Sequence, residues 1–342
     1  MRVGPVGRRD FIGGAAIGSA AACLGVLPLA NAQPSPQGAT SGSRPARIAF
    51  ISGAKSDPRS TFLTALRLGL AELGRIEDRD FRIEMHWGEN SPERFDALVA
   101  DLVRTKPDLI VTQGPILYNV RRSGTQLPVV FAFSGDPVAG GIVESLRRPG
   151  GNATGVSMMA LELVGKRVEA LTGAIPDLRK VAFISNPGHA GESAELAVSQ
   201  AAAAKLGLEI SYLPFNVDGE LDATLAQTLS SRCQALVVFP DGSMMLRSER
   251  FAEFGVRTGI PAVSGWAEFA RRGNLMSYGP NVQQVYRRLA SFVDRVLRGA
   301  KPAELPVELP TLIEHVINLR SARAMGLTIP RAALLRADEV IE

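Results

Sequence analysis

The chain has 342 residues, of which 46% are hydrophobic and 21% charged, and this is enough for two domains that each bury a core. Its formal net charge of +4 includes the arginines of the first ten residues, so the charge balance argues against a nucleic-acid partner. After residue 32 no stretch approaches about 18 uninterrupted apolar residues, and no membrane span is expected there.

Residues 1–32 have the pattern of an export signal. Arg8 and Arg9 stand before Phe-Ile, a weakly apolar Gly/Ala/Leu run follows, and the Ala-Asn-Ala sequence at 30–32 is a small-x-small cleavage site. The paired arginines point to the twin-arginine route. We therefore expect cleavage after about Ala32 and a periplasmic mature protein.

Two alternatives to a cleaved signal stay open at this point. One is a membrane anchor, which Pro28 and the glycines of the run disfavour. The other is a lipoprotein anchored through Cys23, which has no leucine three residues before it. If the signal is removed, Cys233 is the single cysteine of the mature chain, so no intrachain disulfide is expected and its apolar neighbours predict a buried side chain.

Residues 33–46 are rich in Pro, Ser and Gly and are expected to form a flexible leader. From residue 47 short β-branched runs alternate with helical patterns. Strands are expected at 47–53, 81–87, 108–114 and 128–137, with helices at about 58–73, about 92–104 and up to about 123. Near-continuous apolar strands between helices of this length are typical of a parallel sheet covered on both faces.

After a helix that ends near residue 171 the same alternation begins again. Strands are expected at 180–188, 208–215, 235–243 and 261–265, with helices at 191–206, about 219–231 and up to about 258. The chain continues through 273–280, a long helix at 281–298, a Pro-rich strand region at 302–317 and a short helix near 320–325.

The pattern predicts two similar α/β lobes with parallel sheets, joined by a multi-strand hinge. The first lobe is expected to comprise 47–153 plus about 276–305, and the second 154–275 plus about 306–342. Two lobes joined in this way enclose a cleft in which a ligand meets the carboxyl ends of both sheets.

Sequence signatures of enzymes are missing from the chain. It contains neither a Walker sequence nor a G-x-S-x-G elbow. His86, His189 and His315 fall in different predicted elements with no Cys or acidic partner at ligand spacing. We therefore expect no metal site, no cofactor and no catalytic residues.

Small hydrogen-bonding residues follow the predicted strands at their carboxyl ends. A Gly-Pro or Asp-Pro turn before a helix leaves N–H groups that suit a carboxylate, and an aspartate suits an ammonium group. Each Asp, Asn or Ser here is either a ligand contact or an ordinary helix N-cap. The candidate ligand-binding residues are Ser52, Gly53, Gln113, Gly114, Pro115 and Asp136 in the first lobe, and Asn186, Asp241, Ser243, Trp266 and Tyr278 in the second.

Five stretches are similar to one known family. They are RRDFIGG near the start, GDPVAGGIVESLRRPGGNATGVS at 135–157, NLMSYGPN at 274–281, GAKPAELPVELPTLIEHVINLRSARAMGLTIP at 299–330 and LLRADEVIE at 334–342. They resemble the ABC transporter substrate-binding family, which includes tryptophan-binding proteins of the TrpX type. The resemblance covers essentially the whole mature chain and implies a type I periplasmic-binding-protein fold, in which two Rossmann-like lobes close on a small molecule.

The resemblance also bears on the ligand, because characterised relatives bind aromatic amino acids. TQGP stands where relatives often have a TGGTP loop over the ligand, so Gln113 replaces a small residue and either narrows that wall or changes its polarity. SGW at 264–266 stands where relatives often have Tyr or Phe before the W-x-E-F motif, so an aromatic lid ahead of Trp266 is missing. Both departures weigh against specificity for aromatic amino acids.

These observations predict a periplasmic solute-binding protein of an ABC importer. It is expected to be a monomer that passes a small ligand to a membrane permease and its ATPase. The ligand is expected to be an amino acid or a related carboxylate, with its carboxylate held by Ser52, Gln113 and the Gly114 amide and its amine by Asp241 or Asp136. The alternative is a periplasmic ligand-sensing domain that signals to a membrane receptor.

Overall fold

The computed structural model describes residues 44–342 apart from 58–59, 160 and 216–220. The predicted signal, the alternative anchor at Cys23 and nearly all of the leader therefore lie outside the described residues. Within the part of the chain that is described, no helix has both the length and the apolar character needed to cross a membrane.

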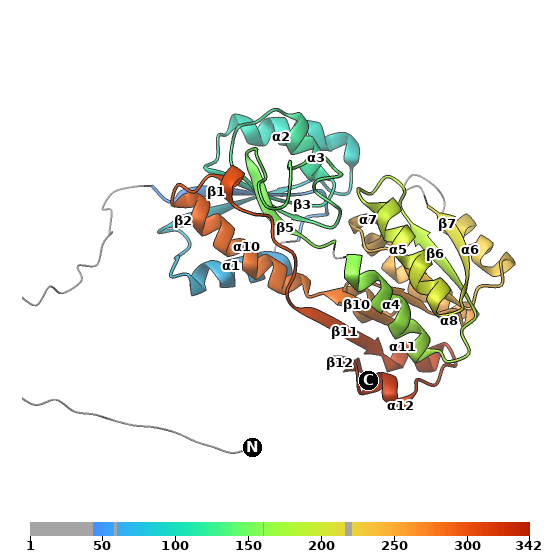
Figure 1. The fold of residues 1–342 in the computed structure, drawn as a ribbon. Coiled ribbons are helices and arrows are strands. Elements are labelled where there is room, and N and C mark those ends of the chain that lie inside the picture. The colour runs from blue at the N-terminus through green and yellow to red at the C-terminus, as the bar shows by residue number, and fades with distance from the viewer. Residues whose placement is uncertain (1–43, 58–59, 160, 216–220) are drawn as a thin grey trace, which may run out of the picture. The chain divides into compact units, whose positions relative to one another are not determined.

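The first sheet has five parallel strands in the order β2-β1-β3-β4-β5 (Figure 1). Its strands are β1 (Ala46–Ser52), β2 (Phe81–Trp87), β3 (Leu109–Gln113), β4 (Val129–Phe133) and β5 (Ala153–Ser157). The helical segments of this lobe are α1 (Thr61–Glu72), η1 (Pro92–Arg94), α2 (Phe95–Arg104), α3 (Ile116–Arg122), α10 (Val282–Leu297) and η2 (Pro302–Glu304).

Helices cover both faces of this sheet, and strand β1 shows why its sequence is an unbroken apolar run. Ile48 and Phe50 pack into the cluster formed with α1 and α10, whereas Ala49 and Ile51 pack into the cluster formed with α2 and α3. Successive side chains of a strand point to opposite faces, so a sheet buried on both sides needs apolar residues at every position.

The second sheet has seven strands in the order β12-β11-β10-β9-β8-β6-β7, parallel except for the β10–β11 pair. Its strands are β6 (Lys180–Ser185), β7 (Glu209–Pro214), β8 (Ala235–Val238), β9 (Ala262–Ser264), β10 (Met276–Pro280), β11 (Ile313–Asn318) and β12 (Glu339–Ile341). The helices of this lobe are α4 (Leu161–Ala174), α5 (Glu192–Lys205), α6 (Leu221–Ser230), α7 (Gly242–Leu246), α8 (Ser248–Thr258), α9 (Ala267–Arg271), α11 (Leu319–Ala324) and α12 (Arg331–Leu334).

This sheet also has a hydrophobic cluster on each face. Val181 and Phe183 of β6 belong to one cluster, and Ala182 and Ile184 belong to the other. Cys233 is 3% exposed within the second of these clusters, which confirms the prediction that it is a buried, small apolar side chain.

The chain connects the two lobes three times. It leaves the first sheet after β5, returns after β10 to form α10, and enters the second sheet again at β11. Helix α10 packs against α1, so the orange and blue helices of Figure 1 lie side by side although they are far apart in the sequence.

Two of these connections differ from the expected positions by a few residues. The predicted boundary between 153 and 154 falls within β5, which pairs with β4 as far as Ser157, and the predicted return at about 276 falls at the start of β10, which pairs with β9 and β11. Gly155 lies within β5 and Gly279 within β10, and in the sequence a glycine at such a position suggests a turn. Here it permits close backbone approach instead: a Cβ on Gly155 would lie 2.0 Å from the Phe131 carbonyl oxygen.

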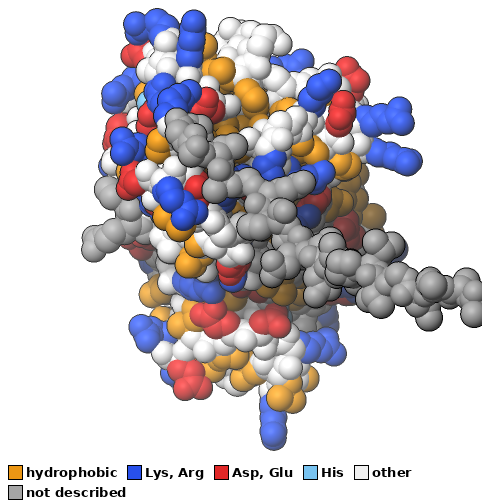
Figure 2. Space-filling model, turned by 90° about the vertical axis from the view of Figure 1, so that its left-hand side faces the viewer, with side chains coloured by type: hydrophobic (Ala, Val, Ile, Leu, Met, Phe, Trp, Pro, Cys, Tyr) orange, Lys and Arg blue, Asp and Glu red, His pale blue; other side chains and the backbone are white. Residues whose placement is uncertain are grey.

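Basic and acidic side chains are interspersed on the face of the molecule drawn in Figure 2. Ion pairs of the first lobe include Arg47–Glu84, Arg67–Glu77 and Arg287–Glu72. Their side chains are about one third to one half exposed, so each pair contributes little to stability.

Candidate functional site

Ser52 and Gln113 occupy paired positions at the carboxyl ends of β1 and β3. The Gln113 side-chain Nε2 donates a hydrogen bond to Ser52 Oγ over 2.8 Å, and the Tyr286 hydroxyl of α10 donates to Gln113 Oε1. We call Ser52, Gln113 and Tyr286 the first-lobe cluster. Two of its members were predicted from the sequence. Tyr286 was not, because the sequence assigns its helix to the first lobe without showing which of the helix's side chains meets the end of β3.

The other candidate residues of the first lobe shape the loops around this cluster. Gly114 has φ +65°, which glycine adopts readily, and Pro115 precedes α3 as its N-cap residue. A Cβ on Gly53 would lie 2.6 Å from the Phe95 ring, so the loop after β1 has no room for a side chain there. These residues fix the loop backbone beside Ser52 and Gln113.

Two residues separate the end of β8 from Asp241, which is the N-cap residue of α7. Its Oδ1 accepts hydrogen bonds from the Met244 amide, over 2.9 Å, and from the Ser243 hydroxyl. Its Oδ2 is buried and has no hydrogen-bond partner among the described residues, although the residue is only 4% exposed. Asp241 is therefore a helix cap through one oxygen and offers a second, unpaired oxygen.

A buried ion pair lies in the same lobe. The Arg167 Nη1 of α4 donates to Glu195 Oε1 of α5 over 2.9 Å, and the two side chains are 3% and 5% exposed. Arg167 Nε also donates to the Tyr278 carbonyl oxygen over 3.2 Å. We call Arg167, Glu195 and Asp241 the second-lobe cluster.

The charges in the second-lobe cluster are coupled. Burial raises the pKa of Glu195, Arg167 opposes that shift, and the negative charge of Asp241 adds to it. Two carboxylates and one guanidinium leave the cluster with one negative charge in excess when all are ionised. A positively charged group would offset that excess.

Neither Arg167 nor Glu195 was among the predicted site residues. A signal was present in the sequence for the arginine, because Val164, Val168 and Leu171 form the buried stripe of α4 and Arg167 lies on that stripe. A charged residue on an apolar helix face needs a buried partner.

Two glycines pack the strand ends tightly around this cluster. A Cβ on Gly279 would lie 1.9 Å from the Gly265 carbonyl oxygen, and a Cβ on Gly265 would lie 2.8 Å from Arg167 Nη2. Side chains at either position would push β9 away from β10 or displace the guanidinium. The backbone of these two strands therefore holds Arg167 in place.

The remaining candidates lie in separate settings. Trp266 is half-buried, and its Nε1 has no partner in the part of the chain that the structure describes. Tyr278 is half-buried and its ring lies edge-on to His315, with centroids 5.6 Å apart. Asn186 Oδ1 accepts from the Gly188 amide over 3.0 Å, so this side chain closes a turn.

One carboxylate oxygen of Asp136 also bonds to its own loop, since Oδ1 accepts hydrogen bonds from the Val138 and Ala139 amides. Its own amide donates to the Ala190 carbonyl oxygen of the second lobe over 3.0 Å. Next to it, Ser134 Oγ lies 2.9 Å from His189 Nε2. Asp136 therefore lies where a loop of each lobe meets the other.

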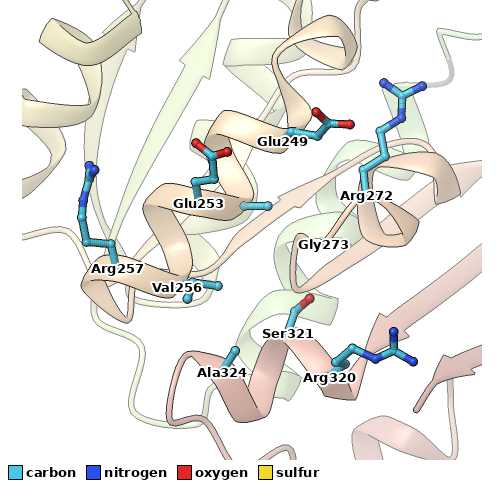
Figure 3. A pocket seen from close by; sticks show the side chains of 10 residues that line it. Glu249, Glu253, Val256, Arg257, Arg272, Gly273, Arg320, Ser321 and Ala324 are labelled. Carbon is cyan, nitrogen blue, oxygen red and sulfur yellow. The ribbon is translucent and has the colours of Figure 1, made fainter.

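A pocket on the second lobe lies apart from all of these residues. It is formed by α8, by Arg272 and Gly273, and by α11, and acidic and basic side chains project around it (Figure 3). None of the predicted site residues lines it. Within the described residues, no group of three or more His, Cys, Asp or Glu is arranged to hold a metal ion.

Two α/β lobes with parallel sheets, connected three times, define a type I periplasmic-binding-protein fold. The fold agrees with that of a solved ABC domain in complex with L-Trp from Streptococcus pneumonia, with a TM-score of 0.79 and 24% sequence identity. The match covers 87% of this chain and 100% of that one. A conserved domain protein from Vibrio cholerae gives the same TM-score and coverage at 23% identity. The predicted fold class is confirmed.

The chain belongs to the family of ABC transporter substrate binding proteins, whose model matches residues 48–341. A tyrosine-binding protein of Clostridioides difficile (strain R20291) is 20% identical over 275 residues, which is 79% of each chain. The family consists of solute-binding proteins and not of enzymes. The resemblance inferred from the sequence motifs is therefore confirmed.

Proposed function

We propose that this protein binds an amino acid, with the ammonium group of the ligand against Asp241 and its carboxylate against Gln113, and delivers it to an ABC permease in the inner membrane. The observation that carries the proposal is Oδ2 of Asp241, a buried carboxylate oxygen without a partner among the described residues. A buried charged atom is costly unless it is paired, and a ligand ammonium supplies the missing donor.

The charge of the second-lobe cluster supports the same assignment. Arg167 is already paired with Glu195, so it does not neutralise Asp241 by a direct ion pair. A zwitterion matches a negative second-lobe cluster and the N–H donor of Gln113 in the first lobe. The similar proteins named for tyrosine and found with L-Trp are binders of such zwitterions, which is why we place amino acids first.

A thermal-shift screen tests the proposal. We expect L-tryptophan, L-tyrosine or another amino acid at about 100 times its dissociation constant to add about 2.7 kcal/mol to the free energy of unfolding. Tryptamine, which lacks the carboxylate, and indole-3-propionate, which lacks the amine, are the matched controls and should stabilise far less. Stabilisation by sugars and by none of the amino acids would refute the proposed ligand class.

We propose further that the protein reaches the periplasm by the twin-arginine route, because a single residue separates Arg8 and Arg9 from Phe11, where the apolar run of the expected signal begins. Replacing both with Lys preserves charge but not the motif. We expect the double variant to accumulate as precursor in the cytoplasm, as measured by fractionation and immunoblotting. Normal periplasmic appearance of that variant would mean that the general secretory route suffices.

A further inference from the structure

The Gln113 side-chain amide is held at both ends. Its Oε1 accepts from the Tyr286 hydroxyl, and its Nε2 donates to Ser52 Oγ over 2.8 Å. Ser52 Oγ also accepts from the Ala54 amide over 3.2 Å, and Ser52 is only 1% exposed. Ser52 therefore lies behind Gln113 and supports it, whereas Gln113 itself is partly exposed.

Tyr286 holds the oxygen end of the amide. Its side chain is buried and burial raises the pKa of its hydroxyl, so the phenol keeps its proton. Within the described residues, its hydroxyl bonds to Gln113 alone. If the amide were reversed, Nε2 would face the phenol oxygen and the phenolic proton would have no acceptor.

The Tyr286 ring is itself fixed in place. It stacks on Phe62, with ring centroids 4.8 Å apart and planes 11° apart. The residue belongs to α10, which packs against α1. The phenol oxygen is therefore held in one position beside the Gln113 amide.

A primary amide has two N–H donors, and Ser52 uses one of those of Gln113. With Oε1 accepting from Tyr286 and one Nε2 hydrogen donated to Ser52, the second Nε2 hydrogen is left for a ligand. We infer that Tyr286 is a positioning residue that makes Gln113 a donor-only contact, so that the first lobe selects a carboxylate over a carboxamide on the ligand. This inference rests on the proposed function and deepens it.

The selection has a simple chemical basis. A carboxylate accepts hydrogen bonds at both oxygens, and an N–H donated to a charged acceptor is stronger than one donated to a neutral carbonyl. A carboxamide replaces one acceptor by an NH₂ group, which opposes a donor. If the Gln113 amide were free to reverse, its oxygen would accept from that NH₂ group and the preference for the acid would shrink.

Tyr286→Phe removes the hydroxyl and keeps the ring against Phe62. We expect the ratio of affinities for L-tryptophan and L-tryptophanamide, measured by titration calorimetry, to fall about tenfold in this variant. Gln113→Glu places acceptors where the amide donates, and should lower the ratio further. Tyr118→Phe is the matched control: it removes the same atom in the same lobe, from a hydroxyl with no hydrogen bond in the described part of the chain, and should leave the ratio unchanged.

A purely structural role for Tyr286 would weaken both ligands equally, and an unchanged ratio in Tyr286→Phe overturns the inference. If the wild type binds neither probe, the proposed ligand is wrong. The orientation of the Gln113 amide can then be tested in the protein without ligand. There, the side-chain ¹H–¹⁵N resonances of Gln113, assigned by their loss in Gln113→Glu, should shift in Tyr286→Phe and not in Tyr118→Phe. Identical resonances in Tyr286→Phe would refute the inference without reference to any ligand.

Discussion

Arg167→Met should lower the free energy of unfolding by about 3–5 kcal/mol at pH 7. Methionine is an apolar side chain of similar length, so the substitution leaves Glu195 as a buried carboxylate without its cation. It also leaves the Tyr278 carbonyl oxygen without its Nε donor. The guanidinium and the carboxylate are each almost fully buried, so water cannot replace the lost partner.

The loss should also depend on pH. Burial already raises the pKa of Glu195, and without Arg167 nothing in the pair opposes that shift. A carboxyl whose pKa is higher in the folded than in the unfolded state gains stability from protonation, and that gain disappears as the pH rises. The deficit of Arg167→Met should therefore shrink when urea unfolding is repeated at pH 5.

The neighbouring residue provides a control for this experiment. Lys166 pairs with Glu169 on the same helix, but the two side chains are 57% and 50% exposed, so Lys166→Met should cost less than about 1 kcal/mol. If Arg167→Met costs no more than Lys166→Met, the ion pair is not the stabilising contact described here. A deficit of the same size at pH 5 would mean that charge is not its cause.

Asp241→Asn should weaken binding of the amino-acid ligand by at least about tenfold, equivalent to roughly 1.4 kcal/mol. Asparagine keeps the oxygen that caps α7 through the Met244 amide, and it replaces the unpaired Oδ2 by an NH₂ group. That group repels a ligand ammonium. The melting temperature of the free protein should change little, because the cap remains.

Titration calorimetry and a thermal melt on the same preparation measure both quantities. Asp222→Asn is the control, since this carboxylate is 73% exposed and paired with Arg250 on the surface. Asp136→Asn tests the alternative position for the ammonium group, because Asp136 also uses one oxygen as a cap. Loss of affinity in Asp136→Asn but not in Asp241→Asn would move the ammonium site to the first lobe.

Much of the fold could be predicted from local pattern alone. The apolar run of β1 requires burial on both faces, and the alternation of such runs with helices requires parallel sheets, so both lobes followed from the sequence. The lobe boundaries did not follow to the residue, because Gly155 and Gly279 look like turn residues and in fact allow two backbones to touch. That contact is a property of the packed sheet and not of the local sequence.

The candidate site shows the same division. Ser52, Gln113 and Asp241 were predicted because they follow strands, and the position after a strand is a local property. Tyr286 and Glu195 were missed because their partners lie far away in the sequence: the phenol joins α10 to β3, and the carboxylate joins α5 to α4. No periodicity within a single element reports which distant element will cover it.

The placement of α10 on the first sheet has a consequence for the order in which the molecule is made. All five strands of that sheet are synthesised by residue 157, but one of its faces lacks its α10 cover until the second lobe has been almost entirely synthesised. The second sheet also waits, because β11 and β12 come last. Neither sheet of a nascent chain is therefore complete in the order of its own strands: the core of the first sheet waits for α10, and the second sheet waits for the C-terminal strands.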